Sequence, residues 1–198
     1  VFVEAKTAIH TFIRTLESFE FSVSRLNALV LSFFRRFAQL LRERFAADFQ
    51  QAIREAQHQP MIVNDATELA KVLSVCWLKP GEAEQLGKQP FPLSLPFSQT
   101  YPLCCMDIRS LVEQYYSFSQ GMTQYHQEID AILSQSLDDL LIQLISVNIR
   151  DTVEQSNNLS QIAQIIVNIE HFQLACSELE KWLSDSSTPN PGLSLIHI

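Results

Sequence analysis

The sequence predicts an all-α protein, built as an elongated stack of antiparallel helical bundles with one extended strap rich in proline and phenylalanine. Of the 198 residues, 46% are hydrophobic and 18% charged, with thirteen phenylalanines and only four glycines, which indicates a packed, mostly helical body. Apolar residues recur at steps of three and four along most of the chain. Three prolines within residues 88–98 exclude a helix there, because proline lacks a backbone donor and biases its predecessor toward extended geometry.

The N-terminal part contains two helical tracts. The first spans residues 2–21, and the second, residues 24–55, is the clearest helix in the chain. A rise of about 1.5 Å per residue would make the second helix about 50 Å long, which is more than a compact domain usually needs. Its apolar positions are Val23, Leu26, Leu29, Val30, Phe33, Phe34, Phe37, Leu40, Leu41, Phe45, Phe49 and Ile53.

A short extended segment and a short helix follow. Pro60 cannot continue the long helix, so residues 58–63 are expected to run extended. Asp65 and Glu68 have the spacing of a capping box, which predicts a helix over residues 66–77. The pair Pro80-Gly81 then predicts a turn.

The strap comes next, at residues 88–98. Alternate residues of an extended chain point to the same side, so Phe91, Leu93, Leu95 and Phe97 are expected to share one apolar edge. We interpret the strap as a clasp that lies in a groove between helices; the alternative is an exposed proline motif that binds a partner. Burial of Phe91 and Phe97 would distinguish the two. The strap residues are Pro90, Phe91, Pro92, Leu93, Leu95, Pro96 and Phe97.

Three further helices are predicted in the C-terminal half. They cover residues 102–120 with Gly121 as a stop, residues 123–149, and a last helix that opens after a cap at Asn158. This gives roughly six helices and no strand ladder. We expect residues 1–185 to be a helical-bundle fragment of a larger rod. Its parts would be a basic helical half (1–77), the strap (78–99) and an acidic helical half (100–185), with a disordered tail at 186–198.

Charge is distributed unevenly. The net charge of −8 argues against nucleic acid as a partner. Residues 22–57 nevertheless carry six arginines against three acids, while residues 107–185 carry twelve acids against three basic residues. The arginines at 35, 36, 42 and 44 either form a solvated face, with their stems over apolar neighbours, or a basic strip that docks an acidic partner or the acidic helices. These candidate partner-binding residues are Arg35, Arg36, Arg42 and Arg44.

The sequence offers little for catalysis. His126 and Asp130 have the spacing of a ligand pair, but nothing supplies further ligands, so surface ion pairing explains them better. Glycines are isolated, and no GxSxG, HExxH or CxxC motif occurs. The four cysteines follow no metal or disulfide spacing, and no apolar run reaches the length of a membrane span. We therefore expect no enzyme, cofactor, metal ion or transmembrane segment; an enzyme whose site is split with a missing part is the remote alternative.

Four segments resemble a known family. They are HQPMIV at 58–63, ATE at 66–68, PFPLSLPFS at 90–98 and QIAQIIVNIEHF at 161–172. In order and spacing they resemble the Sec-fifteen family of exocyst subunits, also called exocyst complex component 6, more in its fungal than its animal form. The resemblance covers most of residues 22–185.

The resemblance implies a non-enzymatic piece of a rod of helical bundles. Members of this family belong to a multisubunit tether, the exocyst, which holds post-Golgi secretory vesicles at the plasma membrane before fusion. Implied partners are other exocyst subunits and a Rab-type GTPase, the latter engaged by the full-length chain and not by this fragment alone. The implied location is cytoplasmic, peripheral at vesicles and at sites of polarised exocytosis. The alternative is a stand-alone helical adaptor that presents the Pro/Phe-rich motif to a binding domain.

Overall fold

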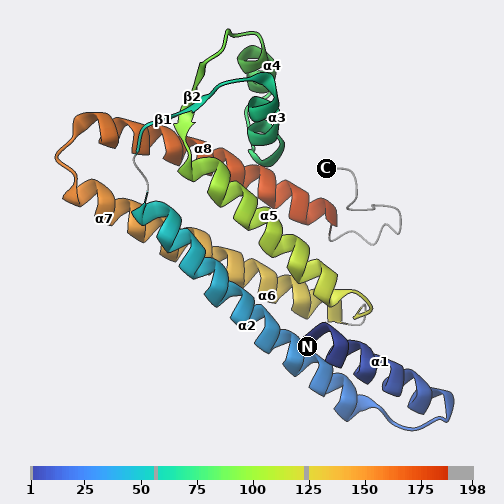
Figure 1. The fold of residues 1–198 in the computed structure, drawn as a ribbon. Coiled ribbons are helices and arrows are strands. Elements are labelled where there is room, and N and C mark those ends of the chain that lie inside the picture. Colours follow the sequence, from blue (N-terminus) through green and yellow to red (C-terminus); the bar gives the residue numbers. More distant parts are fainter. Residues whose placement is uncertain (1, 56–57, 123–124, 187–198) are drawn as a thin grey trace. The chain divides into compact units, whose positions relative to one another are not determined.

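The computed structural model describes residues 2–55, 58–122 and 125–186, and most of them are helical (Figure 1). The all-α class predicted from the sequence is confirmed. The chain divides into two compact units. One comprises Val1–Ala47 and Ser110–Gln143, and the other comprises Asp48–Arg109 and Leu144–Ile198.

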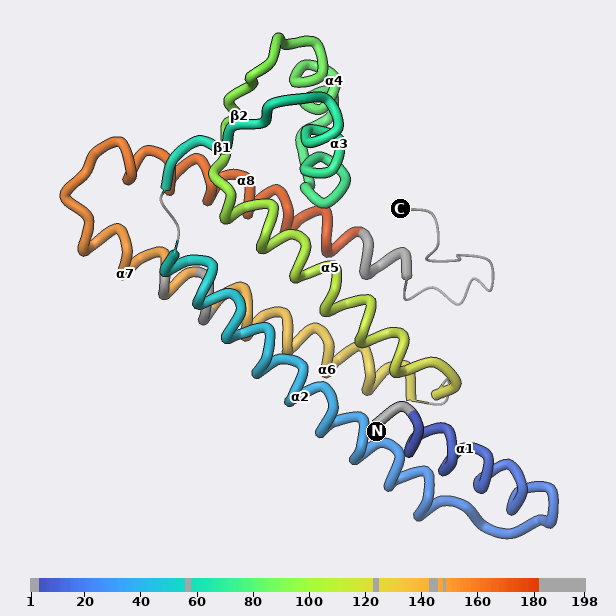
Figure 2. The backbone as a smooth tube through the Cα atoms, viewed as in Figure 1, coloured from blue at the N-terminus to red at the C-terminus, as the bar shows by residue number. Residues whose placement is uncertain are grey.

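The first unit has an aromatic core. It is formed by α1 (Phe2–Ser18), most of α2 (Ser24–Arg54), the second half of α5 (Thr100–Ser119) and α6 (His126–Asp138), and Figure 2 shows α1 folded back along the start of α2. Phe34 is fully buried and meets the Tyr115 ring edge-on at 4.9 Å between centroids. Phe37 stacks on Phe118 at 4.0 Å. The apolar stripe of α2 is therefore held against α5 by ring contacts.

A buried lysine closes the end of α5. The ammonium of Lys6 donates to the carbonyl oxygens of Phe118 (2.5 Å) and Gln120 (2.8 Å). A cation at this position satisfies carbonyls that the helix leaves unpaired and complements its dipole. Burial lowers the pKa of Lys6. Gly121 follows with φ of +84°, a conformation that favours glycine, and so ends the helix as the sequence predicted.

The second unit contains a small antiparallel sheet. Strands β1 (Pro60–Val63) and β2 (Leu93–Ser98) pair with Ile62 opposite Ser94 and Val63 opposite Leu93. The expectation of no strand ladder was therefore wrong at this point. Both segments were predicted to be extended, and pairing satisfies backbone groups that two lone strands would leave open. Helices α3 (Ala66–Val75) and α4 (Glu82–Gly87) lie between the strands in sequence.

The remaining helices of this unit are α7 (Val147–Gln155), α8 (Leu159–Ser186) and the first half of α5. Residues 123–149, predicted as one helix, are instead divided in the described part into α6, a π-helical segment η2 (Asp139–Ser146) and α7. The short helix α4 was not predicted, so the estimate of six helices was too low. The predicted disordered tail lies outside the described residues, apart from Ser186, which ends α8.

The predicted caps are confirmed. Asp65 Oδ1 accepts from the Glu68 N–H (2.8 Å), and Glu68 Oε2 accepts from the Asn64 N–H (2.8 Å). At the start of α8, Asn158 Oδ1 accepts from the Ser160 N–H (3.0 Å). These side chains satisfy helix donors that have no partner within the helix, so they fix where α3 and α8 begin.

We expect Phe34→Ala to lower the free energy of unfolding by about 3–5 kcal/mol, because it opens a cavity in the aromatic core. Phe12→Ala is the matched control. Phe12 belongs to the same unit but its side chain is 54% exposed, so the change should stay within about 0.5 kcal/mol. Urea denaturation followed by circular dichroism measures both, and equal losses would refute this description of the core.

Candidate protein-interaction site

The strap is anchored through one edge of β2. Leu93, Leu95 and Phe97 are buried, with Phe97 at 0% exposure, whereas Ser94 and Pro96 face outward. This is the period of two that a strand requires. Phe91 departs from the prediction, because its side chain is 37% exposed. It precedes the first residue of β2 and so lies outside the regular alternation that places the other three.

An aromatic cluster receives the end of the strap. The Phe97 ring lies 5.1 Å from that of Tyr101 and 5.2 Å from that of His171, and Tyr101 meets Phe172 edge-on at 5.2 Å. These tilted and T-shaped arrangements suit aromatic quadrupoles. The rings come from β2, α5 and α8, so the cluster ties three elements of the second unit together.

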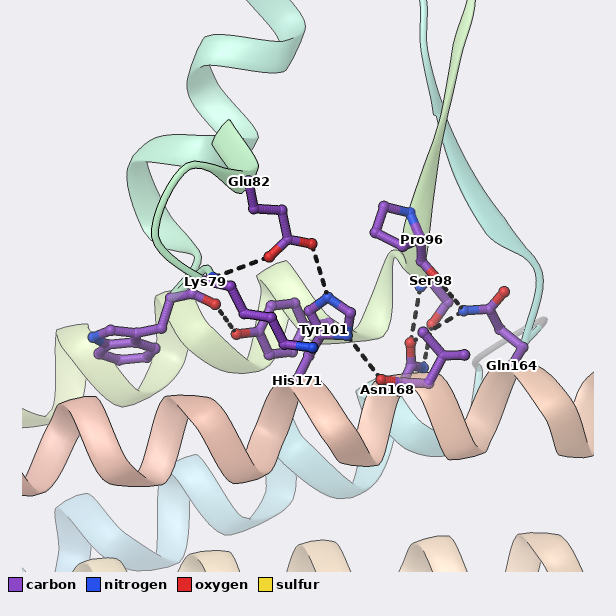
Figure 3. A network of polar contacts seen from close by, with 10 residues as sticks. Lys79, Glu82, Pro96, Ser98, Tyr101, Gln164, Asn168 and His171 are labelled. Carbon is purple, nitrogen blue, oxygen red and sulfur yellow. Dashed lines mark hydrogen bonds and ion pairs between the residues drawn. The ribbon is translucent and has the colours of Figure 1, made fainter. Parts of the chain in front are cut away.

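Two amides of α8 bond to the backbone of β2 (Figure 3). Asn168 Oδ1 accepts from the Ser98 N–H (3.0 Å), and Asn168 Nδ2 donates to Ser98 Oγ (2.7 Å). Gln164 Nε2 donates to the Pro96 carbonyl oxygen (2.9 Å). Ser98, Gln164 and Asn168 are buried, whereas Pro96 is exposed. The amides thus act as a neighbouring strand would, pairing donors and acceptors that β2 would otherwise bury unsatisfied.

A histidine connects α8 to α4. His171 Nε2 lies 3.4 Å from Glu82 Oε1, and its Nδ1 lies 2.8 Å from the Val167 carbonyl oxygen. The Glu82 carboxylate also accepts from the Lys79 N–H (3.0 Å), at the start of α4 (Figure 3). This contact holds the turn before α4 over the aromatic cluster.

Two side chains of α5 bind backbone carbonyl groups at the end of α3 and just after it. The Tyr101 hydroxyl donates to the Trp77 carbonyl oxygen (2.5 Å), and Arg109 Nε donates to the Val75 carbonyl oxygen (2.8 Å). The Arg109 guanidinium also lies over the Trp77 ring, 4.1 Å from its centroid. A hydrogen bond with Cys105, together with burial, raises the pKa of Cys76, and burial raises the pKa of Tyr101. Both groups stay protonated and serve packing.

The strap is therefore built into the second unit. The burial of Phe97 and the two amide contacts favour the clasp interpretation over display of the whole segment as a ligand. The prolines at its start, Pro90 and Pro92, are exposed together with Phe91. Only the part from Leu93 onward is held.

The four candidate arginines have different surroundings. Arg35 and Arg36 are exposed, and Arg36 donates to Gln39 Oε1 (2.9 Å). Arg42 forms an ion pair with Asp139, and the Arg44 guanidinium lies 4.8 Å from the centroid of the Phe45 ring. The Arg42 pair is one contact with an acidic C-terminal segment of the kind the sequence suggested. Partner binding by these arginines stays a prediction.

A groove runs beside this strip in the first unit. Its volume is about 420 Å³. It is lined by α2 and α6, through Arg35, Ala38, Gln39, Arg42, Ala131, Ile132, Gln135 and Ser136.

Within the described ranges, no group of three His, Cys, Asp or Glu side chains is placed to hold a metal ion. The four cysteines are free thiols. Among the helices that the structure describes, none is both long and apolar enough to cross a membrane. Fold and site together define an all-α helical-bundle protein whose strap is packed into its second unit.

Comparison with known proteins identifies the family. Residues 25–195 match the family described as exocyst complex subunit Sec15 C-terminal, and the chain belongs to this family. It is 27% identical over 199 residues to exocyst complex component SEC15 of Saccharomyces cerevisiae. The aligned region covers 98% of this chain and 22% of the yeast protein. It is 28% identical over 184 residues to exocyst complex component 6 of Rattus norvegicus, covering 92% of this chain and 22% of the rat protein.

The human exocyst complex component 6B is 25% identical over 190 residues, covering 96% of this chain and 23% of that protein. No solved structure matches. The chain spans only 22–23% of the length of these relatives.

The residues that anchor the strap on α8 were not identified from the sequence. Gln164, Asn168 and His171 are three and four residues apart, so they share one face of the helix. They lie within the segment 161–172 that carries the family resemblance. The available signal was that these polar residues interrupt the face of the helix that also carries buried apolar side chains such as Ile165 and Phe172.

We expect Phe97→Ala to lower the free energy of unfolding by about 3–5 kcal/mol, because Phe97 fills the aromatic cluster completely. Phe91→Ala, in the same strap, should cost about 1 kcal/mol or less, since Phe91 is partly exposed. Chemical denaturation of both variants measures the difference. A cost near zero for Phe97→Ala would mean that the strap is not held in this way.

We expect Asn168→Ala to destabilise the protein by about 1–3 kcal/mol, because it leaves the buried Ser98 N–H without an acceptor. Amide hydrogen exchange at Ser98 should accelerate in the native state. Asn157→Ala, at an exposed position before α8, serves as control and should stay within about 0.5 kcal/mol. Unchanged exchange at Ser98 in Asn168→Ala would contradict the bonding described.

Proposed function

We propose that this chain is part of a non-enzymatic exocyst subunit, which tethers post-Golgi secretory vesicles to the plasma membrane before fusion. The match of residues 25–195 to the exocyst subunit family carries this proposal. The relatives are named as exocyst components, and most of this chain aligns with each of them. The fold supports it, since most of the residues that the structure describes are helical, as in a rod of helical bundles.

The mechanism is mechanical. Long helices hold partner surfaces at fixed separations, and no covalent bond forms or breaks. The strap contributes by fixing the β1–β2 sheet and helices α3 and α4 to α5 and α8. In this proposal residues 1–185 form a segment of a longer rod of bundles, with a basic half (1–77), a strap (78–99) and an acidic half (100–185).

The proposed partners are other exocyst subunits and a Rab-type GTPase in its GTP state. The arginine strip, Arg35, Arg36, Arg42 and Arg44, is the proposed subunit contact within this chain. The GTPase contact is assigned to the full-length protein and not to these 198 residues alone. The proposed location is cytoplasmic, peripheral at secretory vesicles and at sites of polarised exocytosis. No nucleic acid, cofactor or catalytic step enters the proposal.

Affinity purification of the full-length protein from its own cells tests the function. We expect the other exocyst subunits to copurify in stable amounts, and mass spectrometry identifies them. A Rab-type secretory GTPase should bind the full-length protein when loaded with a non-hydrolysable GTP analogue and not when loaded with GDP. Recovery without any exocyst subunit would refute the assignment, and recovery of a proline-motif-binding domain instead would favour a stand-alone adaptor.

A further inference from the structure

The groove between α2 and α6 has a regular construction. On α2 its lining residues Arg35, Ala38, Gln39 and Arg42 follow steps of three, one and three, so they lie on one face of the helix. The residues of α6 that line the groove follow steps of one, three and one, so they also lie on one face; they are Ala131, Ile132, Gln135 and Ser136. Two alanines, Ala38 and Ala131, contribute small apolar side chains to the floor, so they leave room above it.

The two helices run parallel and in register along this groove. Arg42 pairs with Asp139, a separation of 97 residues in sequence. Arg35 precedes Arg42 by seven residues, which is about two helical turns. Ile132 precedes Asp139 by the same number of residues on α6. Arg42 thus pairs with a carboxylate, whereas the position on α6 equivalent to Asp139 two turns earlier is the isoleucine Ile132, which lines the groove with Arg35.

Arg35 consequently has no carboxylate partner within the part of the chain that the structure describes. Its side chain is exposed, and so is that of Arg36, whose hydrogen bond goes to the neutral amide of Gln39. The residues of α6 that line the groove include no acid. The groove therefore offers an unpaired guanidinium beside small apolar side chains.

We propose that this groove docks an acidic amphipathic helix of a partner protein. An Asp or Glu of that helix pairs with Arg35, which can bind a carboxylate through two parallel hydrogen bonds. An apolar side chain three or four residues away on the same helix rests on Ala38, Ala131 and Ile132. The proposal rests on the proposed function in one respect: it takes the partner to be a subunit of the same complex.

The surrounding charges favour a helix over an anionic membrane surface. Glu128 and Asp138 are exposed on α6, and Asp139 lies at the end of the groove. A flat polyanionic surface that reached Arg35 would also approach these carboxylates and be repelled. A single helix can place one carboxylate at Arg35 and turn its remaining charges away.

Site-specific photo-crosslinking in living cells tests the proposal. A photoreactive amino acid replaces Gln39, which lines the groove and is exposed, in the full-length protein. We expect crosslinks to one segment of one exocyst subunit, with helical spacing and at least one Asp or Glu. Arg35→Glu should lower the crosslink yield at least about tenfold, because it replaces an attraction with a repulsion. Reversing the identified carboxylate to Arg should restore the yield with Arg35→Glu.

Arg25→Glu is the matched control, an exposed arginine of α2 outside the groove, and it should leave the yield unchanged. An unaltered melting temperature of Arg35→Glu excludes unfolding as the cause of its loss. Crosslinks to a second copy of this chain or to a segment without acids, an unchanged yield with Arg35→Glu, or Arg35-dependent binding of the purified protein to phosphatidylserine vesicles would each overturn the proposal. If exocyst subunits copurify but Gln39 yields no crosslink, the groove proposal fails while the proposed function stands.

Discussion

The second unit depends on how β2 meets α8. A strand that packs on a helix buries one row of backbone donors and acceptors, and each such group costs free energy if it is left unpaired. Asn168 and Gln164 supply the missing partners from the helix side, at the Ser98 N–H and the Pro96 carbonyl oxygen. Because these bonds form only in one register, they determine which residues of the strap face the helices.

The apolar contacts alone would not determine that register. A shift of one residue would turn Leu93, Leu95 and Phe97 toward solvent, but a shift of two would again present an apolar row. The amide bonds distinguish these arrangements, since only the observed one places Ser98 opposite Asn168. Burial of apolar side chains thus holds the strap in place, and hydrogen bonds select its register. The contacts of Tyr101 and His171 extend the same arrangement to Trp77 and Glu82.

Much of this fold could be predicted from local patterns. Helix α2 ends one residue from the predicted position, and the caps at Asp65 and Asn158 act as their spacing indicates. The pairing of β1 with β2 could not be predicted in this way, because it joins segments about thirty residues apart that each have few signals of their own. Phe91 was misplaced because strict alternation was extended past the start of the strand. The anchoring amides, and the lack of a carboxylate near Arg35, depend on which helices are neighbours.

Buried and exposed polar side chains of this protein differ in whether they need a partner within the fold. Asn168, Gln164 and His171 are buried, and each has a partner that burial makes necessary. Arg35 is exposed, so water solvates its charge, and leaving it without a carboxylate costs the folded chain little. Such a group contributes little to folding, but on binding it can form a bidentate pair in a site from which water is excluded. In the proposal that the groove docks a partner helix, Arg35 therefore contributes to association and little to stability.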